Sequence, residues 1–261
     1  MPYATLKNFL LDLIFPRHCL DCQKELELKS DFNLICEACF DKIILNSGIQ
    51  CHICGLRNNQ GTCRKCREKT PLKGLFAASQ YENPILKKMI HLFKYQSIEL
   101  FKKPLSRLTI NFLKKENLTG KFNNVVLTPI PLTLKRKLSR GFNQSELLAE
   151  EIGKALNCPV MNLLKRKKFA SPQAEISDWQ QRKENVSGAF ALNIHNLSPK
   201  LLIPRIEESA EGGGRILGIN SFLKVILVDD VATSAATLEE AANVLTQAGI
   251  EEIYGLVVAK G

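Results

Sequence analysis

The chain has 261 residues and a formal net charge of +10 at neutral pH. No apolar run approaches the ~20 residues that a membrane-spanning helix needs, so the composition excludes a transmembrane segment and predicts a soluble protein. The length allows a compact domain of about 180 residues and a small additional module. We place the boundary near Pro71, with the module at residues 1–71 and the domain at residues 72–261.

The first residues have the spacing of a short amphipathic helix. Apolar side chains recur at helical intervals between Leu6 and Ile14, which favours a docking helix over a membrane anchor. The apolar run at residues 9–11 is broken by Asp12, and no small-residue cleavage site follows, so the pattern is not that of a secretory signal. We therefore expect a cytoplasmic location, either free or peripheral at the inner face of the membrane.

Cysteine spacing is the strongest signal in the first module. Eight of the nine cysteines form four Cys-x-x-Cys pairs: Cys19 and Cys22, Cys36 and Cys39, Cys51 and Cys54, Cys63 and Cys66. Two pairs complete one tetrahedral structural zinc site, so four pairs predict a double zinc ribbon with two zinc ions. A disulfide framework is the alternative, which the absence of a secretory pattern disfavours. We prefer ribbons built from sequential pairs, and an interleaved arrangement stays open. The ninth cysteine, Cys158, is interpreted as a small core residue.

Strand and helix patterns alternate after the cysteine pairs. We predict a strand at residues 77–81, helices at residues 84–95 and 105–113, and a short strand at residues 125–128 that stops at two prolines. A basic loop is expected next. Asn143, with Glu146 three residues later, then predicts the cap of a further helix. This order predicts an α/β fold with a mostly parallel sheet and flanking helices.

Positive charge is concentrated in the middle of the chain. Residues 71–197 carry 21 basic and 9 acidic side chains, an excess larger than the net charge of the whole protein. Such a field attracts polyanions, although most single lysine pairs are expected to be ordinary solvated surface. Four adjacent charges repel one another unless a partner neutralises them. The candidates for DNA binding are therefore Lys165, Arg166, Lys167 and Lys168.

The most informative segment lies at residues 225–237. An unbroken apolar run leads into Asp229 and Asp230, as expected where a buried parallel strand delivers polar groups to the carboxyl edge of a sheet. The turn that follows can wrap a phosphate with its backbone N–H groups, and it consists of Thr233, Ser234, Ala235, Ala236 and Thr237. The capping-box spacing of Thr237 and Glu240 predicts a helix that begins at Thr237 and runs to Gly249, before a strand at residues 253–259.

A ribose 5-phosphate fits both halves of this segment. The two carboxylates can accept hydrogen bonds from vicinal ribose hydroxyls, and the turn can bind the phosphate. An ordinary strand and turn with two chance aspartates is the alternative, which the combination of acid pair, hydroxyl-rich turn and capping box disfavours. If the turn requires a positive φ at position 235, an alanine there is strained.

Residues 228–237 resemble the 5-phosphoribosyl-1-diphosphate (PRPP) motif of type I phosphoribosyltransferases. The resemblance implies that the two acidic residues hold the ribose 2- and 3-hydroxyls and that the turn binds the 5-phosphate. It also implies magnesium as the cofactor that accompanies PRPP. The usual motif has glycine where this chain has Ala235.

A second resemblance covers about residues 9–259 and is to the ComF family of competence-associated proteins, which join an N-terminal zinc ribbon to a type I phosphoribosyltransferase-like domain. It rests on Pro129-Ile130-Pro131-Leu132, Arg136, Arg140-Gly141-Phe142-Asn143-Gln144, Gln173, Arg182 and Asn185-Val186-Ser187-Gly188-Ala189-Phe190. The resemblance implies a diphosphate-binding region with Pro131, Leu132, Arg136, Arg140 and Gly141. It also implies a mobile loop with Gln173, Arg182 and Asn185.

Two stretches depart from the family. Ala170 stands where we expect a threonine, which weakens a catalytic role for that position. Residues 198–221 form a polar, glycine-containing insertion that we expect to be flexible.

Three functions stay open. The first is a competence protein that binds PRPP with magnesium, single-stranded DNA and other DNA-uptake proteins. The second is a phosphoribosyltransferase of nucleotide salvage that acts on an unknown acceptor. The third, a PRPP-sensing gene regulator, is weaker because no helix-turn-helix pattern is evident. We identify no residues that form a base-recognition pocket, and we therefore prefer the first.

Overall fold

The computed structural model describes residues 18–26, 34–96, 98–167, 188–193, 202–205, 216–219 and 224–261. Its first elements are α2 (Glu37–Phe40), β1 (Ile49–Gln50), β2 (Arg57–Asn58), the 3-10 helix η1 (Arg67–Lys69), β3 (Leu72–Gln80), α3 (Pro84–Tyr95), η2 (Glu99–Phe101), α4 (Lys102–Lys115), η3 (Thr119–Phe122) and β4 (Val125–Pro129). They are followed by α5 (Leu134–Arg140), α6 (Gln144–Leu156), β5 (Leu164–Arg166), β6 (Phe190–Leu192), β7 (Leu202–Arg205), β8 (Ile216–Ile219), β9 (Lys224–Ala232), α8 (Ala236–Gln247) and β10 (Glu252–Lys260).

The docking helix predicted before residue 18 lies outside the described residues. Within these ranges, no helix combines the length and the apolar character needed to cross a bilayer.

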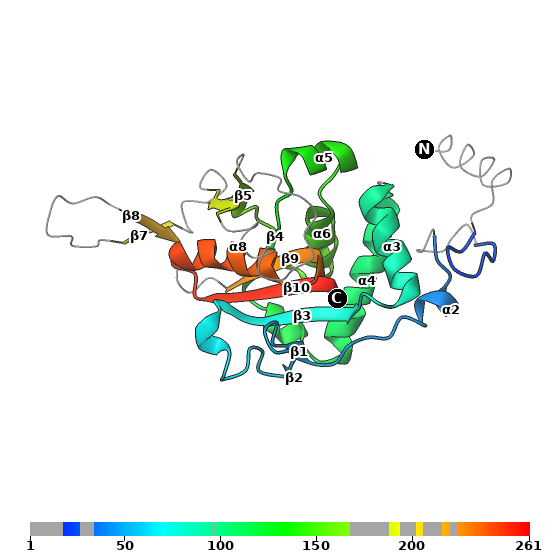
Figure 1. Cartoon of the computed structure of the whole chain (residues 1–261), viewed down its shortest axis with the longest axis horizontal. Coiled ribbons are helices and arrows are strands. Elements are labelled where there is room, and N and C mark those ends of the chain that lie inside the picture. Colours follow the sequence, from blue (N-terminus) through cyan, green and yellow to red (C-terminus); the bar gives the residue numbers. More distant parts are fainter. Residues whose placement is uncertain are drawn as a thin grey trace, which may run out of the picture.

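A six-stranded sheet forms the centre of the molecule, in the order β2-β1-β3-β10-β9-β4 (Figure 1). Strands β3, β10, β9 and β4 are parallel, whereas β1 and β2 add antiparallel strands beside β3. Helix α8 connects the neighbouring parallel strands β9 and β10, which gives a βαβ unit. The predicted α/β fold with a mostly parallel sheet and flanking helices is confirmed.

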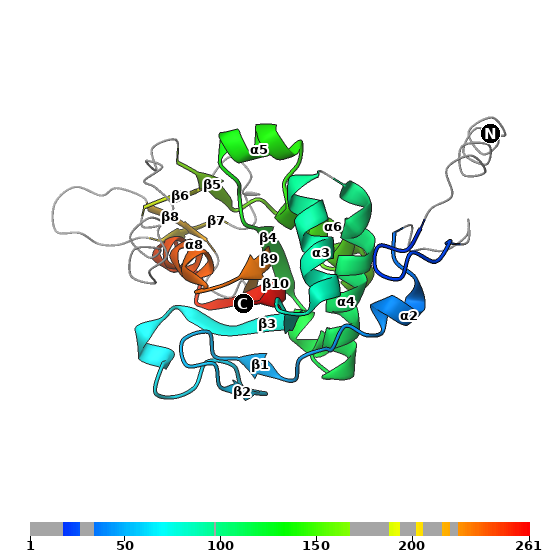
Figure 2. The ribbon, with the colours of Figure 1, turned by 45° about the vertical axis from the view of Figure 1, so that its right-hand side comes forward.

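Helices cover both faces of the sheet (Figure 2). Helices α3, α4 and α6 contribute to the core on one face, and α8 packs on the other. Along β9, Ile226 and Val228 face the first core, whereas Val225 and Leu227 pack with Leu238 of α8. Burial on both faces explains why this strand is an unbroken apolar run.

Side-chain caps set the beginnings of α3 and α6. Asn83 accepts a hydrogen bond from the Leu86 amide at 3.0 Å, and Pro84 occupies the first turn of α3. Asn143 accepts a hydrogen bond from the Ser145 amide at 3.2 Å at the start of α6. The predicted helices at residues 84–95 and after Asn143 are confirmed. The strand predicted at residues 77–81 and the helix predicted at residues 105–113 are also present, as the longer elements β3 and α4.

The basic loop predicted after residue 131 is wrong, because α5 occupies most of it. Thr133 caps this helix by accepting a hydrogen bond from the Arg136 amide at 3.3 Å, and Gly141 ends it with φ of 77°. Leu134 and Leu138 are 70% and 75% exposed, so α5 has no apolar face against the core. Without that face, the sequence lacks the periodicity from which helices are predicted.

Both cysteine-rich segments contact the main domain. Strand β1, which belongs to the second segment, pairs with β3 and so continues the sheet. In the first segment, Lys88 of α3 donates to the Leu20 carbonyl at 2.7 Å. Arg107 of α4 binds the Glu37 carboxylate through two hydrogen bonds of 2.8 and 3.1 Å. The predicted boundary near residue 71 falls between η1 and β3 and stays a prediction.

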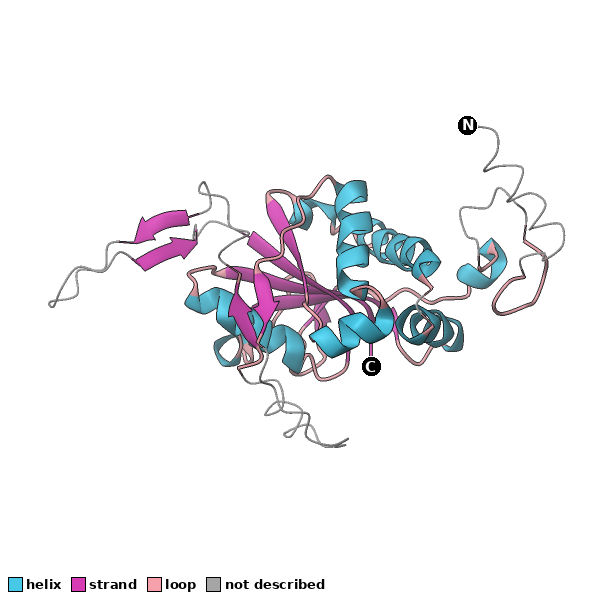
Figure 3. Cartoon of the chain, turned by 90° about the horizontal axis from the view of Figure 1, so that it is seen from above, coloured by secondary structure: helices cyan, strands magenta, loops and turns pink. Residues whose placement is uncertain are grey.

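Two short antiparallel strand pairs complete the described structure (Figure 3). β7 pairs with β8 inside the insertion predicted at residues 198–221, and β5 pairs with β6. The rest of that insertion lies outside the described residues, so its flexibility stays a prediction. Residues 168–187, between β5 and β6, also lie outside them, and they include Lys168 and the predicted mobile-loop residues Gln173, Arg182 and Asn185.

Candidate functional site

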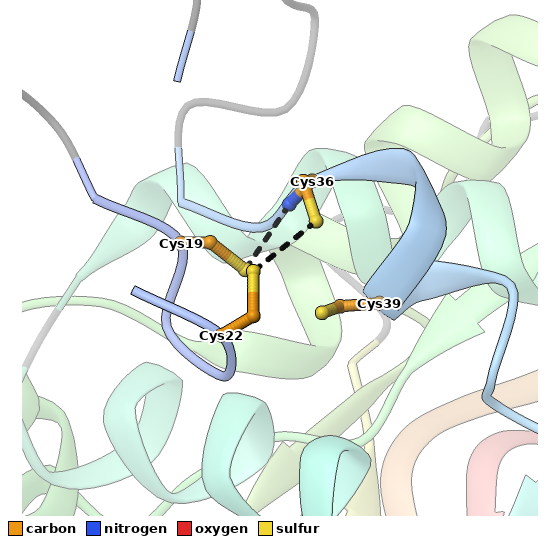
Figure 4. A group of neighbouring side chains, drawn as sticks. All are labelled: Cys19, Cys22, Cys36 and Cys39. Carbon is orange, nitrogen blue, oxygen red and sulfur yellow. Dashed lines mark hydrogen bonds between the residues drawn. The ribbon is translucent and has the colours of Figure 1, made fainter. Parts of the chain in front are cut away.

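The first four cysteines gather at one point (Figure 4). The sulfur atoms of Cys19, Cys22, Cys36 and Cys39 all lie within 4.8 Å of one another. Burial acts to raise the pKa of Cys19, but backbone N–H donors, including Cys36 N at 3.4 Å, outweigh it and lower the pKa to about 6. Four sulfurs at this spacing suit a tetrahedral ion with Zn–S bonds of about 2.3 Å.

The second set repeats this arrangement with Cys51, Cys54, Cys63 and Cys66. The pKa of Cys51 is also lowered to about 6, because backbone donors outweigh the effect of burial. The two sets confirm pairing of sequential knuckles and rule out the interleaved arrangement. Cys158 lies apart from both, as predicted, buried and with its thiol donating to the Phe122 carbonyl at 3.3 Å.

A buried histidine connects the second cysteine cluster to α8. His52, next to Cys51, lies 3.2 Å from the Thr70 hydroxyl through Nε2, and the same atom is 4.0 Å from the Glu239 carboxylate. Glu239 belongs to the first turn of α8, the helix expected to bind phosphate. The second cysteine cluster therefore abuts the predicted ligand site.

The acidic pair lies at the carboxyl end of β9, as predicted. Asp229 Oδ1 accepts hydrogen bonds from the Ser145 hydroxyl at 2.8 Å and from the Asp230 amide at 2.9 Å. The Asp230 side chain is only 7% exposed and forms an ion pair of 3.0 Å with Lys94. Burial of a carboxylate is favourable only with such partners, so the two aspartates are held in defined orientations.

Sequence reasoning missed two of these partners, Lys94 and Ser145. Lys94 is in the last turn of α3, four residues after buried Ile90, and Ser145 is in the first turn of α6. The position of Lys94 four residues after a buried apolar residue was the available signal, since such residues share a helix face. The sequence did not show which residue Lys94 contacts, because that depends on the packing of α3 beside β9.

The pKa of Asp229 is raised to about 6. Burial is the largest cause and repulsion by Asp230 adds to it, whereas Lys94 and the hydrogen bond from Ser145 act in the opposite direction. Asp229 is therefore ionised at neutral pH and becomes protonated under mildly acidic conditions.

Ligand binding at the acidic pair should weaken as pH falls through about 6. If only the ionised form of Asp229 accepts both ribose hydroxyls, affinity for ribose 5-phosphate should drop about tenfold between pH 7 and pH 5. The phosphate of the ligand also titrates, with a second pKa of about 6, and therefore adds to the dependence of affinity on pH. Asp229→Asn is the matched control, because it keeps the contribution of the ligand and removes that of Asp229. Titrations across this range should show a shallower slope in the variant, and identical slopes would exclude Asp229 as the titrating group.

The turn after the acid pair leads directly into α8. Ala235 has φ of +59° and is the residue before the helix, which begins at Ala236. The positive φ at position 235 explains why related motifs have glycine there, since this conformation costs an L-residue roughly 1–2 kcal/mol. The prediction that α8 begins at Thr237 is wrong, because the left-handed residue at position 235 places the first helical residue at Ala236.

Replacing Thr237 by Val should separate phosphate binding from helix stability. Because Thr237 lies inside α8 and does not cap it, the melting temperature of the variant should stay within about 2 °C of wild type. Binding of ribose 5-phosphate should weaken, because the hydroxyl that donates to the phosphate is lost. Thr246→Val, an exposed site in the last turn of α8, is the matched control. A fall in melting temperature for Thr237→Val alone would mean that the hydroxyl does cap the helix.

The predicted diphosphate residues lie on and around α5. Arg140 donates to the Gln144 amide oxygen at 3.1 Å and stacks over the Tyr95 ring, 5.5 Å from its centre, whereas Arg136 is exposed. Gly141 ends the helix, and Pro131 and Leu132 precede it. This segment follows β4, whose last residue pairs with Val228, so it lies beside the end of β9.

The predicted cluster of basic residues is divided by β5. Lys165 and Lys167 are exposed, whereas Arg166 between them is partly buried and stacks on the Phe190 ring, 5.1 Å from its centre. Side chains alternate between the faces of a strand, so the two lysines and the arginine point in opposite directions. Lys165 and Lys167 remain available to a polyanion at the surface.

Comparison with known proteins identifies the relatives of this chain. Residues 10–67 match the double zinc ribbon domain family. The chain is similar over most of its length to Competence protein F of Haemophilus influenzae, with 28% identity over 252 residues, 94% of this chain and 98% of the relative. The chain is a homologue of the ComF competence proteins. Competence protein ComFC of Bacillus subtilis is 26% identical over 227 residues, 82% of this chain and 79% of the relative.

DNA utilization protein YhgH of Escherichia coli K12 is a further relative, 26% identical over 219 residues, 82% of this chain and 85% of the relative. The ComF resemblance predicted from the motifs is therefore confirmed. The double zinc ribbon is confirmed by the family match and by the two four-cysteine sites. The names of these ComF homologues refer to competence and to DNA utilization, which supports a competence-related role.

Proposed function

We propose that this protein binds PRPP with magnesium at the carboxyl edge of its sheet. The observation that carries the proposal is the placement of Asp229 and Asp230 at the end of β9, immediately before the turn that begins α8. The carboxylates accept hydrogen bonds from the ribose hydroxyls. The N–H groups of the first helical turn, which have no partner within the helix, bind the 5-phosphate together with the hydroxyls of Thr233, Ser234 and Thr237.

The diphosphate group of PRPP extends from the ribose toward the α5 segment. Arg136 and Arg140 supply donors to its oxygens, and the backbone around Pro131, Leu132 and Gly141 surrounds it. Oxygen donors suit magnesium, and the Asp229 and Asp230 carboxylates are available beside the ligand's own oxygens. Magnesium supplies charge neutralisation for the diphosphate.

Calorimetric titration with PRPP tests the proposal. Wild-type protein should bind PRPP, and omission of magnesium should weaken binding because the diphosphate charge is then uncompensated. Ribose 5-phosphate and inorganic diphosphate, titrated separately, show how much each half of the ligand contributes. Wild-type protein that binds none of the three with magnesium present rejects the proposal.

We further propose that the protein binds single-stranded DNA through its basic surface. The excess positive charge of residues 71–197 includes the exposed lysines Lys165 and Lys167. The relatives named for competence and DNA utilization support a DNA-related role. Such a surface binds phosphates with little regard to sequence, and other DNA-uptake proteins then supply or receive the strand.

DNA binding should weaken steeply with salt and depend on Lys165 and Lys167. Each phosphate of a single strand that the protein neutralises contributes about −0.7 to the slope of log K against log salt concentration. If both lysines contact phosphate, the double variant Lys165→Gln with Lys167→Gln should therefore have a slope that is less steep by about 1.4. Lys114→Gln with Lys115→Gln, an exposed pair in the last turn of α4, is the control. Titration of fluorescent oligonucleotides at several salt concentrations measures this, and a salt-independent affinity would exclude phosphate-driven binding.

The second candidate function is phosphoribosyl transfer to a nitrogen acceptor. The observation that favours it is the β5 and β6 pair, which flanks the predicted mobile loop in sequence and carries Arg166, a residue within electrostatic reach of Asp229. Release of diphosphate from PRPP across a panel of bases distinguishes an enzyme from a binding protein. Turnover with any base favours the enzyme, whereas binding without turnover favours PRPP as an effector.

A further inference from the structure

Arg166 is held in place by the strand pair that carries it. It is opposite Phe190 in the ladder between β5 and β6, and its guanidinium carbon lies 5.1 Å from the centre of the Phe190 ring. Stacking on an aromatic face restricts a side chain that is otherwise flexible. Its neighbours Lys165 and Lys167 are exposed, so Arg166 alone of the three turns inward.

The Arg166 guanidinium has unmet hydrogen-bonding capacity. Its Nε atom is buried and has no hydrogen-bond partner among the residues that the structure describes. A guanidinium offers five N–H donors in a planar fork, and burying one without an acceptor is unfavourable. An acceptor that is not part of this structure would remove that cost.

The charges around Arg166 indicate what kind of acceptor it takes. Burial lowers the pKa of Arg166, the positive charge of Arg136 lowers it further, and the negative charge of Asp229 raises it. The partly buried guanidinium of Arg166 and the exposed guanidinium of Arg136 are close enough to repel each other, and together they suit an anion with several oxygens. Arg140 differs from them, because Gln144 and Tyr95 already engage its side chain.

We propose that Arg166 is a diphosphate-binding residue of the proposed PRPP site and that it binds the diphosphate of PRPP together with Arg136. The inference rests on the proposed PRPP site and deepens it by assigning a residue that neither the motif nor the basic cluster placed there. The turn before α8 then binds the 5-phosphate, and Asp229 and Asp230 bind the ribose hydroxyls. Arg166 binds the diphosphate on the anomeric carbon. Arg166 thereby favours PRPP over ribose 5-phosphate.

Three substitutions test the role of Arg166. Arg166→Met removes the charge but keeps a flexible apolar stem against Phe190, and Arg166→Lys keeps the charge but loses the planar fork. Lys114→Met, which removes an exposed positive charge in the last turn of α4, is the matched control. Each protein is titrated with PRPP, ribose 5-phosphate and inorganic diphosphate in the presence of magnesium, after its melting temperature has been compared with wild type.

Arg166→Met should bind PRPP and diphosphate about 10- to 100-fold more weakly and ribose 5-phosphate within about twofold of wild type, as expected for loss of hydrogen bonds to a charged group. Arg166→Lys should be intermediate, and it replaces the methionine variant if that variant does not fold. Lys114→Met should match wild type with all three ligands.

Two results would overturn the assignment while leaving the PRPP site intact. One is wild-type affinity of Arg166→Met for PRPP, and the other is an equal loss for ribose 5-phosphate and PRPP. Wild-type protein that binds neither PRPP nor ribose 5-phosphate overturns the proposed function and, with it, this inference. The wild-type titration therefore distinguishes the two failures.

Discussion

Asp229→Asn should weaken PRPP binding by about 1.5–3 kcal/mol, or roughly 10- to 150-fold, while leaving the fold intact. The substitution keeps the shape of the side chain and an oxygen that can accept from the Ser145 hydroxyl. It removes the negative charge and with it the strong acceptors for the ribose hydroxyls. Calorimetry with PRPP and magnesium measures the change.

The same substitution should not lower stability, which separates a binding role from a structural one. The pKa of Asp229 is about 6 in the folded protein, above its ordinary value of 3.8, so ionisation costs folding free energy as pH rises between these values. Asparagine carries no such cost, and the melting temperature at pH 7 should be equal to or above that of wild type.

Glu251→Gln is the control for this experiment. Glu251 is exposed and lies just before β10, at the edge of the sheet opposite the acidic pair. The change removes one negative charge from the protein as Asp229→Asn does, and it should leave PRPP affinity unchanged. Equal losses in the two variants would mean that net charge, rather than contact with the ribose, controls binding.

Loss of zinc from the second ribbon should unfold that ribbon. Wild-type protein should retain two zinc ions per chain after dialysis, Cys51→Ser one, and Cys158→Ser two. A small ribbon buries little core and obtains most of its folding free energy from the metal, about 10–16 kcal/mol for structural zinc in peptides. Elemental analysis gives the metal content, and circular dichroism gives the loss of structure.

Unfolding of the second ribbon should also weaken ligand binding. His52 beside Cys51 contacts Thr70 and approaches Glu239 in the first turn of α8, and β1 pairs with β3 of the central sheet. Without these contacts the phosphate turn loses support, so Cys51→Ser should bind ribose 5-phosphate more weakly than Cys158→Ser. One zinc ion or none in wild-type protein would contradict the ligand assignment, and unchanged binding in Cys51→Ser would show that the ribbon does not support the turn.

Features encoded by short, local patterns could be predicted from the sequence. Helix α3 has the predicted bounds, because an asparagine cap, an N-terminal proline and an apolar face all lie within one segment. The cysteine knuckles were assigned because zinc needs four thiolates and each pair brings two. Strand β9 was recognisable because burial on both faces requires an unbroken apolar run.

Features that depend on contacts between distant segments could not be predicted. Lys94 and Asp230 are 136 positions apart and meet only because α3 packs beside β9. In the sequence, Arg166 cannot be distinguished from the lysines beside it. The pairing of β5 with β6 places Arg166 opposite Phe190, and this determines that its side chain points inward. The start of α8 was misplaced because the left-handed conformation of Ala235 competes with the capping box, and a capping pattern does not reveal backbone conformation.

The most direct test of the PRPP site is a crystal structure of the protein with PRPP and magnesium. We predict density for the ribose with its 2- and 3-hydroxyls on Asp229 and Asp230 and for the 5-phosphate at the turn formed by residues 233–237. The diphosphate should lie between the α5 segment and Arg166. Clear density for PRPP elsewhere on the molecule, or no PRPP density at these residues in crystals grown at saturating PRPP, would contradict the proposed site.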